Sequence, residues 1–556
     1  MPGAPDNPPN GRHWPFFGLA LLVVGSFILR VNHLGHPALN PMDEAFHAVV
    51  ARNLLSAPLT PMLYAEPVVA FDYRDWKSNH IWLHKPVWPL WQMALSMALL
   101  GIDTWAMRLP SALLAAGAVG VIYLIGAWLC CWRVGLIAAA LAACNPATVT
   151  LVQGYIFSDH VDIALLFWST LSVCLLVRSA KTGSMVAAGL AGATQGIAFL
   201  CKYYPALFVA IIALALWRLG GETLRLRGRN LLAFAAAAML ASLPWLAICA
   251  VRFPDEFWYE QLHALSHLTR DVEQFAAPWD RLWADYLLRL NHVFYPLVLV
   301  ALGLTGWRAW RLRSVAIGLP VIWWLTVVIP FTLATSKTPS AAVIALPAGW
   351  LAVGLAARFA FDGDRVALGA MLTAAALGCF AGGGFPKQGW GYPDPPVFAG
   401  VLREWSWPFI HAGIAAAVGI GAVWFPGNLA RWRVPLLGGL GLCMLWLCSR
   451  SAVMSLRITE LNRQEPSFRE VGRAAVALPG DCVLLIEEAP GEKFAHIAAM
   501  FWTGLPCYRT TAESWREDGA RLLRSGRPVF LLSEHERPLP VAVAVVGDRR
   551  WVYTIR

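Results

Sequence analysis

Apolar segments close to the length of a lipid bilayer recur through most of this chain, and they constrain its fold more than any other feature. A transmembrane helix needs about 20 mostly apolar residues, and the first such run, WPFFGLALLVVGSFIL, occupies residues 14–29. Only 14% of the 556 residues are charged, against about 25% in soluble domains. The sequence therefore predicts an all-α polytopic membrane protein.

The positive charges follow the loops between these segments. The net charge of +10 could indicate a nucleic-acid partner, but most lysines and arginines lie in short loops, which is typical of the cytoplasmic side of a membrane protein. No nucleic acid is therefore expected. The alternation predicts about thirteen transmembrane helices, at residues 14–29, 109–130, 134–153, 161–177, 184–201, 204–218, 231–250, 294–310, 314–335, 341–357, 365–383, 407–425 and 434–449.

Two segments need a separate interpretation. No small-residue cleavage site follows residues 14–29, so this run is expected to be an uncleaved anchor with the N-terminus in the cytoplasm. Residues 86–101 are apolar as well, but counting them as a span would place every later basic loop outside. We expect an interfacial or re-entrant helix there, and Trp88 and Trp91 suit that depth. The polar loops, residues 252–293 and the tail after Arg450 then lie on the outer side.

The composition changes near residue 450. We expect residues 1–450 to form the transmembrane part and residues 451–556 a small periplasmic α/β domain. DCVLLIEE, PVFLLSE, VAVAVV and RWVYTI are typical of strands, and two helical segments lie between them. Cys482 and Cys507 are the two cysteines of this tail. They could form a disulfide in an oxidising compartment, or remain two buried thiols.

The stretch NPMDEAFHAVVARNLL (residues 40–55) places an acid on an apolar helix face. At about 100° per residue, Asp43 projects with Val50 and Leu54, whereas Glu44 is expected to point away. An acid in the first turn also stabilises a helix N-terminus, which is the simpler explanation. However, a partly desolvated carboxylate at a membrane interface has a raised pKa and is a useful base. His47, one turn further on, could hydrogen-bond to Asp43.

Five ordered motifs resemble a known family. They are the Asp43-Glu44 pair after an outward span, HKPVWPLWQMALSMALLGIDTWAMRLPSALLA (residues 84–115), SDHVDIALLFW, GIAFLCKYYPAL and SKTPSAAVIALPA. Together, over about residues 14–350, they resemble the bacterial aminoarabinose transferase and protein O-mannosyltransferase family. These are glycosyltransferases with the GT-C fold that use polyprenyl-phosphate sugars. The sequence departs from the family pattern at His47, Val87, Tyr203-Tyr204 and Ala341, which leaves the sugar and the acceptor open.

The resemblance implies roles for individual residues. Since a phosphate leaves as a stable anion, such a reaction needs positive charge on the phosphate and a base for the acceptor hydroxyl. Asp43 would be the base, and Asp162 would orient the acceptor or hold a lysine, with Asp159 as its rival. An in-line attack would invert the anomeric carbon. The implied binding residues are Glu44, His47, Lys85, Lys202 and Lys337, with His267 and Arg270 as a looser match.

Other features carry weaker expectations. His263, His267 and Asp271 have helical spacing that could bind zinc, but an amphipathic outer helix is the expected structure, and no cofactor or metal is expected. Residues 382–396 are rich in glycine and proline and are expected to connect two spans or line the cavity.

The expected function is that of an inverting glycosyltransferase of the bacterial inner membrane, with its site on the periplasmic side. Its partners would be a polyprenyl-phosphate sugar, membrane lipids and an acceptor such as lipid A, a glycan, a lipid or a protein hydroxyl. The alternative is a non-catalytic binder or a transporter of lipid-linked sugars. A transporter is expected to carry polar groups at mid-membrane depth, whereas here they gather at one end.

Overall fold

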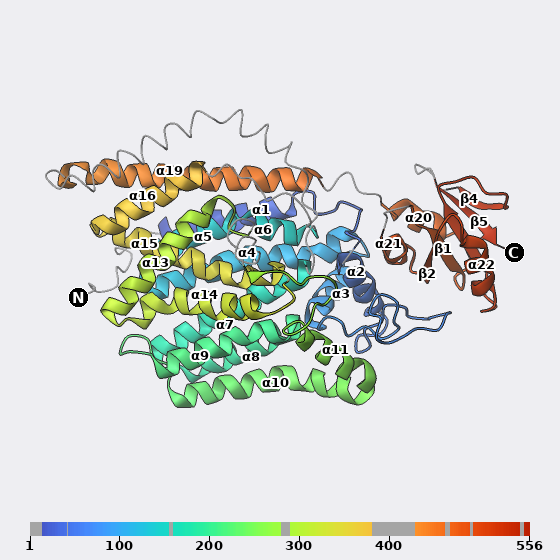
Figure 1. Cartoon of the computed structure of the whole chain (residues 1–556), viewed down its shortest axis with the longest axis horizontal. Coiled ribbons are helices and arrows are strands. Elements are labelled where there is room, and N and C mark those ends of the chain that lie inside the picture. Colours follow the sequence, from blue (N-terminus) through green and yellow to red (C-terminus); the bar gives the residue numbers. More distant parts are fainter. Residues whose placement is uncertain are drawn as a thin grey trace.

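The computed structural model describes residues 14–41, 43–154, 159–279, 290–337, 339–380, 429–461, 467–489, 493–544 and 550–555. Most of them form a bundle of helices that run along the long axis of the molecule, and a smaller α/β region lies beyond one end of the bundle (Figure 1). The helices of the bundle are α1 (Trp14–Val31), α4 (Thr104–Leu129), α5 (Trp132–Ala143), α6 (Pro146–Val152), α7 (Asp159–Thr182), α8 (Met185–Lys202), α9 (Phe208–Arg218), α10 (Gly228–Arg252), α13 (Tyr295–Leu312), α14 (Val315–Leu333), α15 (Leu346–Phe361), α16 (Arg365–Phe380) and α19 (Leu429–Leu461).

These helices confirm the prediction that this part of the chain consists of apolar helices able to cross a membrane. Among the described residues, seven helices are long and apolar enough to cross a membrane, or eight if α5 and α6, bent by 52° at their junction, count as one span. Helices α1, α9 and α16 are apolar but shorter. Every predicted span coincides with helix except residues 407–425, which lie outside the described residues. The number thirteen remains a prediction.

Small residues allow the closest helix packing in the bundle. Gly192 and Gly196 of α8 are spaced four residues apart. A Cβ atom at Gly192 would lie 2.1 Å from the Phe234 carbonyl oxygen, and one at Gly196 would lie 2.5 Å from the Ala238 carbonyl oxygen, both in α10. Such small residues let two helix backbones approach each other within a membrane, where burial of apolar surface alone gives no driving force. The GxxxG spacing thus fixes the position of α8, which ends at Lys202.

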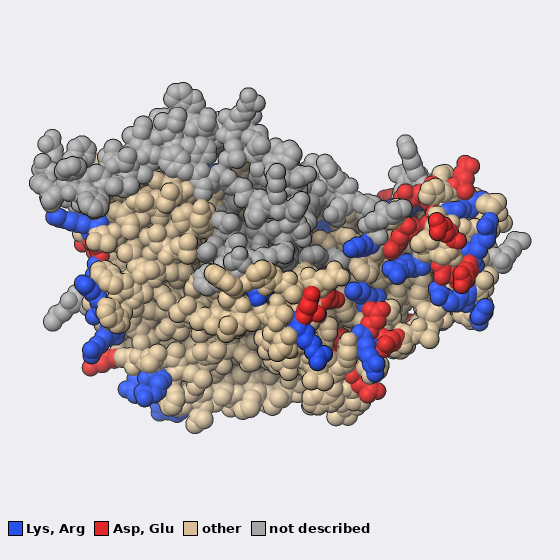
Figure 2. Space-filling model, in the orientation of Figure 1, with Lys and Arg blue, Asp and Glu red and all other residues tan. Residues whose placement is uncertain are grey.

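The basic loops meet at one end of the bundle. The Lys181 ammonium donates a hydrogen bond to the Trp128 carbonyl, and the Arg225 backbone N–H donates to the Ala180 carbonyl at 3.2 Å. Arg308 forms an ion pair with Asp364. Figure 2 shows lysine and arginine side chains gathered at the end of the molecule farthest from the α/β region, with a broad uncharged band between. This arrangement agrees with the predicted alternation of the loops.

At the opposite end, two short helices and a long connection lie beside the bundle. Helix α2 (Asp43–Asn53) precedes the connection, and α3 (Trp88–Leu100) follows it. With 13 residues, α3 is about 20 Å long, which is too short to cross a bilayer, as the interfacial prediction requires. The connection contains no regular strand, but an antiparallel bridge joins Met62 and Ile81 within it.

The α/β region contains a five-stranded sheet in the order β2-β1-β3-β5-β4. The central strand β1 is parallel to both neighbours, whereas β5 is antiparallel to β3 and β4. The predicted alternation of strands and helices is therefore confirmed. The elements are α20 (Arg469–Ala475), β1 (Val483–Glu487), α21 (Ala495–Thr503), β2 (Cys507–Thr510), α22 (Trp515–Leu523), β3 (Val529–Ser533), β4 (Val541–Ala544) and β5 (Trp551–Ile555).

The α/β region is packed directly against α2. Phe46 of α2 and Phe501 of α21 are fully buried in one shared apolar core, and burial of a side chain of this size contributes roughly 1.5–3 kcal/mol. The Arg52 guanidinium donates a hydrogen bond to the Phe501 carbonyl, and the Trp502 indole N–H donates to the Pro37 carbonyl at 3.2 Å. Helix α2 and the segment that precedes it are thus both anchored to α21.

The disulfide considered for the tail is not formed. Cys482 and Cys507 are both buried free thiols. The strand register explains this, because Cys507 lies opposite Leu484 on β1, two residues along the chain from Cys482. The Cys507 thiol instead donates a hydrogen bond to the Leu505 carbonyl at 3.3 Å.

Candidate functional site

The candidate site forms where α2 begins, at the end of the bundle that faces the α/β region. Asp43 is the first residue of α2 and is only 8% exposed. Its Oδ2 atom lies 3.9 Å from the Lys85 ammonium nitrogen. Burial by itself would raise the pKa of Asp43, but electrostatic interactions with Lys85, His47, His84 and Lys202 hold this pKa well below its usual range.

This result corrects the expectation of a raised pKa. The Lys85 and Lys202 ammonium groups act on Asp43 more strongly than the sequence indicates, so the carboxylate is ionised at neutral pH. It is consequently available to accept a hydrogen bond, and later a proton, from a hydroxyl group. His47 is completely buried one turn along α2, and burial lowers its pKa to about 4, so its imidazole is neutral.

Lys85 is positioned by a histidine that the sequence analysis did not single out. Its ammonium lies 3.1 Å from His84 Nε2, and His84 Nδ1 lies 3.2 Å from Glu260 Oε2 on α11 (Pro254–Ser266). Burial lowers the pKa of His84 and raises that of Glu260 to about 7. A neutral His84 can therefore donate from Nδ1 to Glu260 and accept at Nε2 from Lys85.

A second lysine stands beside a second buried acid. The Lys202 ammonium donates a hydrogen bond to Asp162 Oδ1 at 2.6 Å, and Asp162 is fully buried in α7. Of the two roles suggested for Asp162, this contact supports the one that holds a lysine. The next residue, Tyr203, has φ = +49°, a region that favours glycine. The family motif has glycine where this chain has Tyr203-Tyr204.

Both lysines line one cavity. It has a volume of about 260 Å³ and is bounded by the ends of α8, α11 and α14. Tyr203, Tyr204 and Phe331 supply aromatic walls, and His267 contributes a polar group. Two ammonium groups in a largely apolar wall form a suitable site for an anion with an attached apolar chain.

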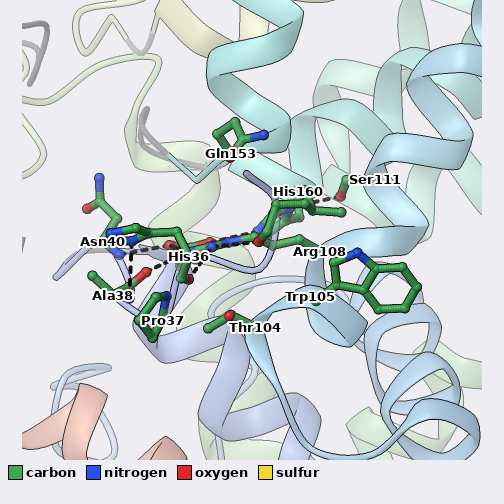
Figure 3. Close-up of polar contacts among 12 residues, drawn as sticks. His36, Pro37, Ala38, Asn40, Thr104, Trp105, Arg108, Ser111, Gln153 and His160 are labelled. Carbon is green, nitrogen blue, oxygen red and sulfur yellow. Dashed lines mark hydrogen bonds and ion pairs between the residues drawn. The ribbon is translucent and has the colours of Figure 1, made fainter. Parts of the chain in front are cut away.

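Glu44 is not on a solvent-facing side, contrary to the expectation. Its side chain is 1% exposed and forms a bidentate ion pair with Arg108 of α4, at 2.6 Å from Nε and 3.1 Å from Nη2. His160 Nε2 lies 3.2 Å from the same carboxylate, and the Asn40 backbone N–H donates to it at 2.7 Å. Figure 3 shows how Arg108, His160 and Asn40 converge.

This network fixes the chain just before Asp43. The remaining N–H groups of Arg108 donate to the carbonyl oxygens of Leu34, His36 and Ala38 at 2.6–3.0 Å. A Cβ atom at Gly154 would lie 2.2 Å from the Glu44 carboxylate, so no larger residue fits there. Glu44 was predicted to bind substrate, but the structure gives it these protein partners, and its position is that of a support for Asp43.

The remaining predicted residues lie farther from the centre. Lys337 is buried, and its ammonium donates to the Ala334 carbonyl, whereas its neighbour Ser336 lines the cavity. Arg270 is exposed and does not line the cavity. The side chain of Asp159 and all of residues 382–396 lie outside the described residues.

The histidine row on α11 contributes rings to the cavity. The His263 and His267 rings are 5.5 Å apart at their centroids, and His263 lies 5.7 Å from His84. Asp271 turns away, because its Oδ1 accepts a hydrogen bond from the Ala276 backbone N–H. In the part of the chain that the structure describes, no group of three or more metal-ligating side chains could hold an ion.

Comparisons with known proteins agree with the motif resemblance. Residues 84–248 match the family described as dolichyl-phosphate-mannose-protein mannosyltransferase. The undecaprenyl phosphate-alpha-4-amino-4-deoxy-L-arabinose arabinosyl transferase 1 of Pseudomonas fluorescens Pf-5 is 28% identical over 286 residues, which is 48% of this chain and 49% of the relative. The corresponding transferase of Pseudomonas aeruginosa PAO1 is 28% identical over 221 residues, 37% of this chain and 38% of that protein. The match thus spans about half or less of these relatives.

Solved structures establish the fold over nearly the whole chain. ArnT from Cupriavidus metallidurans, bound to undecaprenyl phosphate, superimposes with a TM-score of 0.63 at 15% identity and covers 97% of this chain and 98% of its own. The apo oligosaccharyltransferase of Archaeoglobus fulgidus gives a TM-score of 0.55 at 11% identity and covers 94% of this chain and 70% of its own. The chain therefore has the GT-C fold, and the resemblance drawn from its motifs is confirmed.

Proposed function

From this similarity in fold and sequence, we propose that the chain is an inverting membrane glycosyltransferase that moves a sugar from a polyprenyl phosphate to an acceptor hydroxyl. The observation that supports this most is the position of Asp43 beside Lys85, 3.9 Å apart. A carboxylate able to accept a proton and a cation able to hold a phosphate stand next to each other. Lys85 and Lys202 line the same cavity.

The reaction follows from these positions. The acceptor oxygen attacks the anomeric carbon and forms the new glycosidic bond, while the bond from that carbon to the phosphate oxygen breaks. The hydroxyl proton passes to Asp43, and the bonding electrons leave on the phosphate. Lys85 and Lys202 stabilise the resulting phosphate charge. Because the pKa of Asp43 is low, proton transfer takes place as the new bond forms rather than before it.

The supporting residues have positioning roles in this proposal. His84 holds Lys85, Asp162 holds Lys202, and the Glu44–Arg108 pair holds the start of α2. His47 and His267 border the place where sugar and acceptor meet, and Lys337, Arg270 and Asp159 remain as proposed contacts of parts of the substrates. The donor is a hexosyl or pentosyl polyprenyl phosphate, and lipid A, a glycan, a lipid or a protein hydroxyl serves as acceptor.

Removal of the Lys85 charge tests the donor site. Lys85→Ala is expected to weaken binding of undecaprenyl phosphate by about 10- to 100-fold, because a hydrogen bond to a charged group contributes roughly 1.5–3 kcal/mol. Binding is measured with the purified protein in nanodiscs, together with turnover. Lys493→Ala, at an exposed lysine of the α/β region, is the control and should bind normally. Unchanged binding by Lys85→Ala would remove Lys85 from the phosphate site.

The proposal also places the site and the α/β region on the periplasmic side of the inner membrane. The support is the gathering of basic loops at the other end of the bundle, which is typical of the cytoplasmic face. A reporter that is active only outside the cytoplasm, fused after Arg556, is expected to be active. A cysteine placed at Arg313 should react with an impermeant reagent only after the membrane is opened. The reverse labelling pattern would invert the topology and contradict the site assignment.

A further inference from the structure

A second and larger cavity lies between the α/β region and the connection that follows α2. Its volume is about 980 Å³, within the size range of cavities that bind small molecules. One wall is formed by Asp75, Lys77 and Ser78 of the connection, and the other by residues that follow strands β1, β2 and β3. No step of the proposed transfer has used this cavity.

The position of this cavity in the fold favours ligand binding. Glu487 ends β1 and Glu488 follows it, Thr510 ends β2, and Glu534 and His535 follow β3. These three strands are parallel, so their carboxyl ends meet at one edge of the sheet. In open α/β sheets, ligands bind in the crevice outside the carboxyl ends of the strands. Figure 2 shows acidic and basic side chains intermingled on the visible face of the α/β region.

The charges of the wall exclude a polyanion. Six of its side chains carry carboxyl groups, whereas three carry lysine or arginine. A phosphate-rich molecule would therefore meet net repulsion. Carboxylates are strong acceptors for hydroxyl and ammonium donors, so the wall suits a neutral or amino-substituted molecule with many hydroxyl groups.

Several of these groups are already fixed in place. Asp518 Oδ2 accepts hydrogen bonds from Thr510 Oγ1 at 2.7 Å and Ser514 Oγ at 2.9 Å. The Glu487 side chain is 4% exposed, and its Oε1 atom receives Arg537 at 2.6 Å. His535 Nδ1 lies 3.0 Å from the same oxygen, so Arg537 and His535 together fix the Glu487 carboxylate at this wall.

Aromatic rings complete the chemistry of the wall. Tyr508 stacks on Tyr64 with ring centroids 5.1 Å apart, and Phe494 is half-buried at the same cavity. Phe494 has φ = +60°, a conformation that is costly for a bulky residue and that persists only where the surrounding structure imposes it. Rings beside hydrogen-bonding groups suit a saccharide, which has an apolar face and polar edges.

One short segment connects this cavity with the candidate active site. Asp75 and Lys77 line the cavity, while the ring of Trp76 between them stacks on His84 with centroids 4.5 Å apart and planes inclined by 6°. His84 is the residue that holds Lys85. Trp76 and His84 therefore form a chain of contacts from this wall of the cavity to Lys85.

We infer that the cavity binds a neutral or amino-substituted saccharide, as the sugar portion of the acceptor. The role of the saccharide as acceptor rests on the proposed transfer reaction. The existence of a saccharide-binding site is argued from the cavity alone. A bound saccharide at this place lies beside Asp75 and Lys77, the two neighbours of Trp76. The wall thus determines which acceptors are used, whereas the lysine-lined cavity determines which donors are used.

The test is direct binding of probe sugars to the full-length protein in nanodiscs. Chitosan trisaccharide and maltotriose are compared with glucose 1,6-bisphosphate by saturation-transfer NMR, and hydrogen exchange is followed at residues 483–489 and 507–514. We expect the unphosphorylated sugars to bind and to protect these segments. The variant Ala512→Trp, which fills the cavity from an exposed loop position, is expected to weaken their binding by at least ~10-fold.

Ala520→Trp is the matched control, because Ala520 is equally exposed on α22 but does not line the cavity. It should bind the sugars normally, and both variants should bind undecaprenyl phosphate normally. Equal sugar binding by Ala512→Trp and the unmodified protein overturns the inference, as does preference for the bisphosphate or absence of sugar binding. If transfer cannot be detected but the sugars bind with the expected pattern, the proposed function fails while the saccharide site remains.

Discussion

Replacing Asp43 with asparagine is expected to reduce sugar transfer by about 10²–10⁴-fold, the range typical of removing a general base. Asparagine keeps the shape of the side chain at the start of α2, but it cannot take the proton of the acceptor hydroxyl. Binding of undecaprenyl phosphate should stay close to normal, since Lys85 retains its contact with His84. The measurement is the initial rate of transfer from a labelled polyprenyl-phosphate sugar, together with donor binding.

Asp255→Asn is the matched control for this experiment. Asp255 also lies in the first turn of a helix at this end of the bundle, but it is exposed. Its replacement removes a helix-stabilising charge without touching the cavity, so the transfer rate should not change. Near-normal transfer by a folded Asp43→Asn protein would show that Asp43 serves the helix N-terminus alone. The base would then have to be sought at Asp162 or Asp159.

Removing Arg108 is expected to cause the largest loss of stability, about 3–5 kcal/mol, because it leaves the Glu44 carboxylate buried without its cation. The carbonyl groups of Leu34, His36 and Ala38 lose donors at the same time. Arg108→Ala is compared with the unmodified protein by thermal unfolding in nanodiscs. Arg133→Ala, at an exposed position of α5, is the control and should change stability by less than about 0.5 kcal/mol.

A double substitution separates the ion pair from its surroundings. Glu44→Gln combined with Arg108→Met removes both charges, so neither is left buried alone, and stability should recover in part. Activity should remain low, because the residues that precede Asp43 have lost their anchor. If Arg108→Ala unfolds at the normal temperature, the pair does not hold this part of the fold, and Asp43 is positioned by other contacts.

The sequence predicts the fold well because its signals are local. Apolar runs identify the helices of the bundle, the positions of basic loops predict that those loops share one end, and alternating strand and helix patterns predict the small sheet. Each of these depends on the composition of one segment. The number of spans does not follow from apolar runs alone, because α1, α9 and α16 fall below the length of a full span.

The site is predicted only where a residue stands in a recognisable motif. Asp43, Lys85, Lys202 and Asp162 come from motifs, and the structure brings them together. The prediction that Glu44 faces solvent was wrong, because helix periodicity shows which side of a helix is polar but not whether another helix covers that side. Arg108 of α4 and His160 of α7 cover the polar side of α2 and contact Glu44 there.

The partners of Lys85 could not be identified in the same way. Glu260 reaches His84 across 176 positions of sequence, and no local pattern indicates such a pair. Arg108 did give a signal, since a single arginine in an otherwise apolar segment is rare and usually has a partner. That signal predicts a buried counter-charge but not which acid supplies it.

The packing of α21 against α2 limits how this protein can be divided for engineering. The helix that begins with Asp43 contributes Phe46 to the core of the α/β region, and its Arg52 donates a hydrogen bond to the end of α21. An exchange of residues 467–556 for those of a relative would therefore replace half of a core while leaving the other half behind. A workable chimera has to transfer α2 and its following connection together with the sheet, so that the two contacting surfaces come from the same parent.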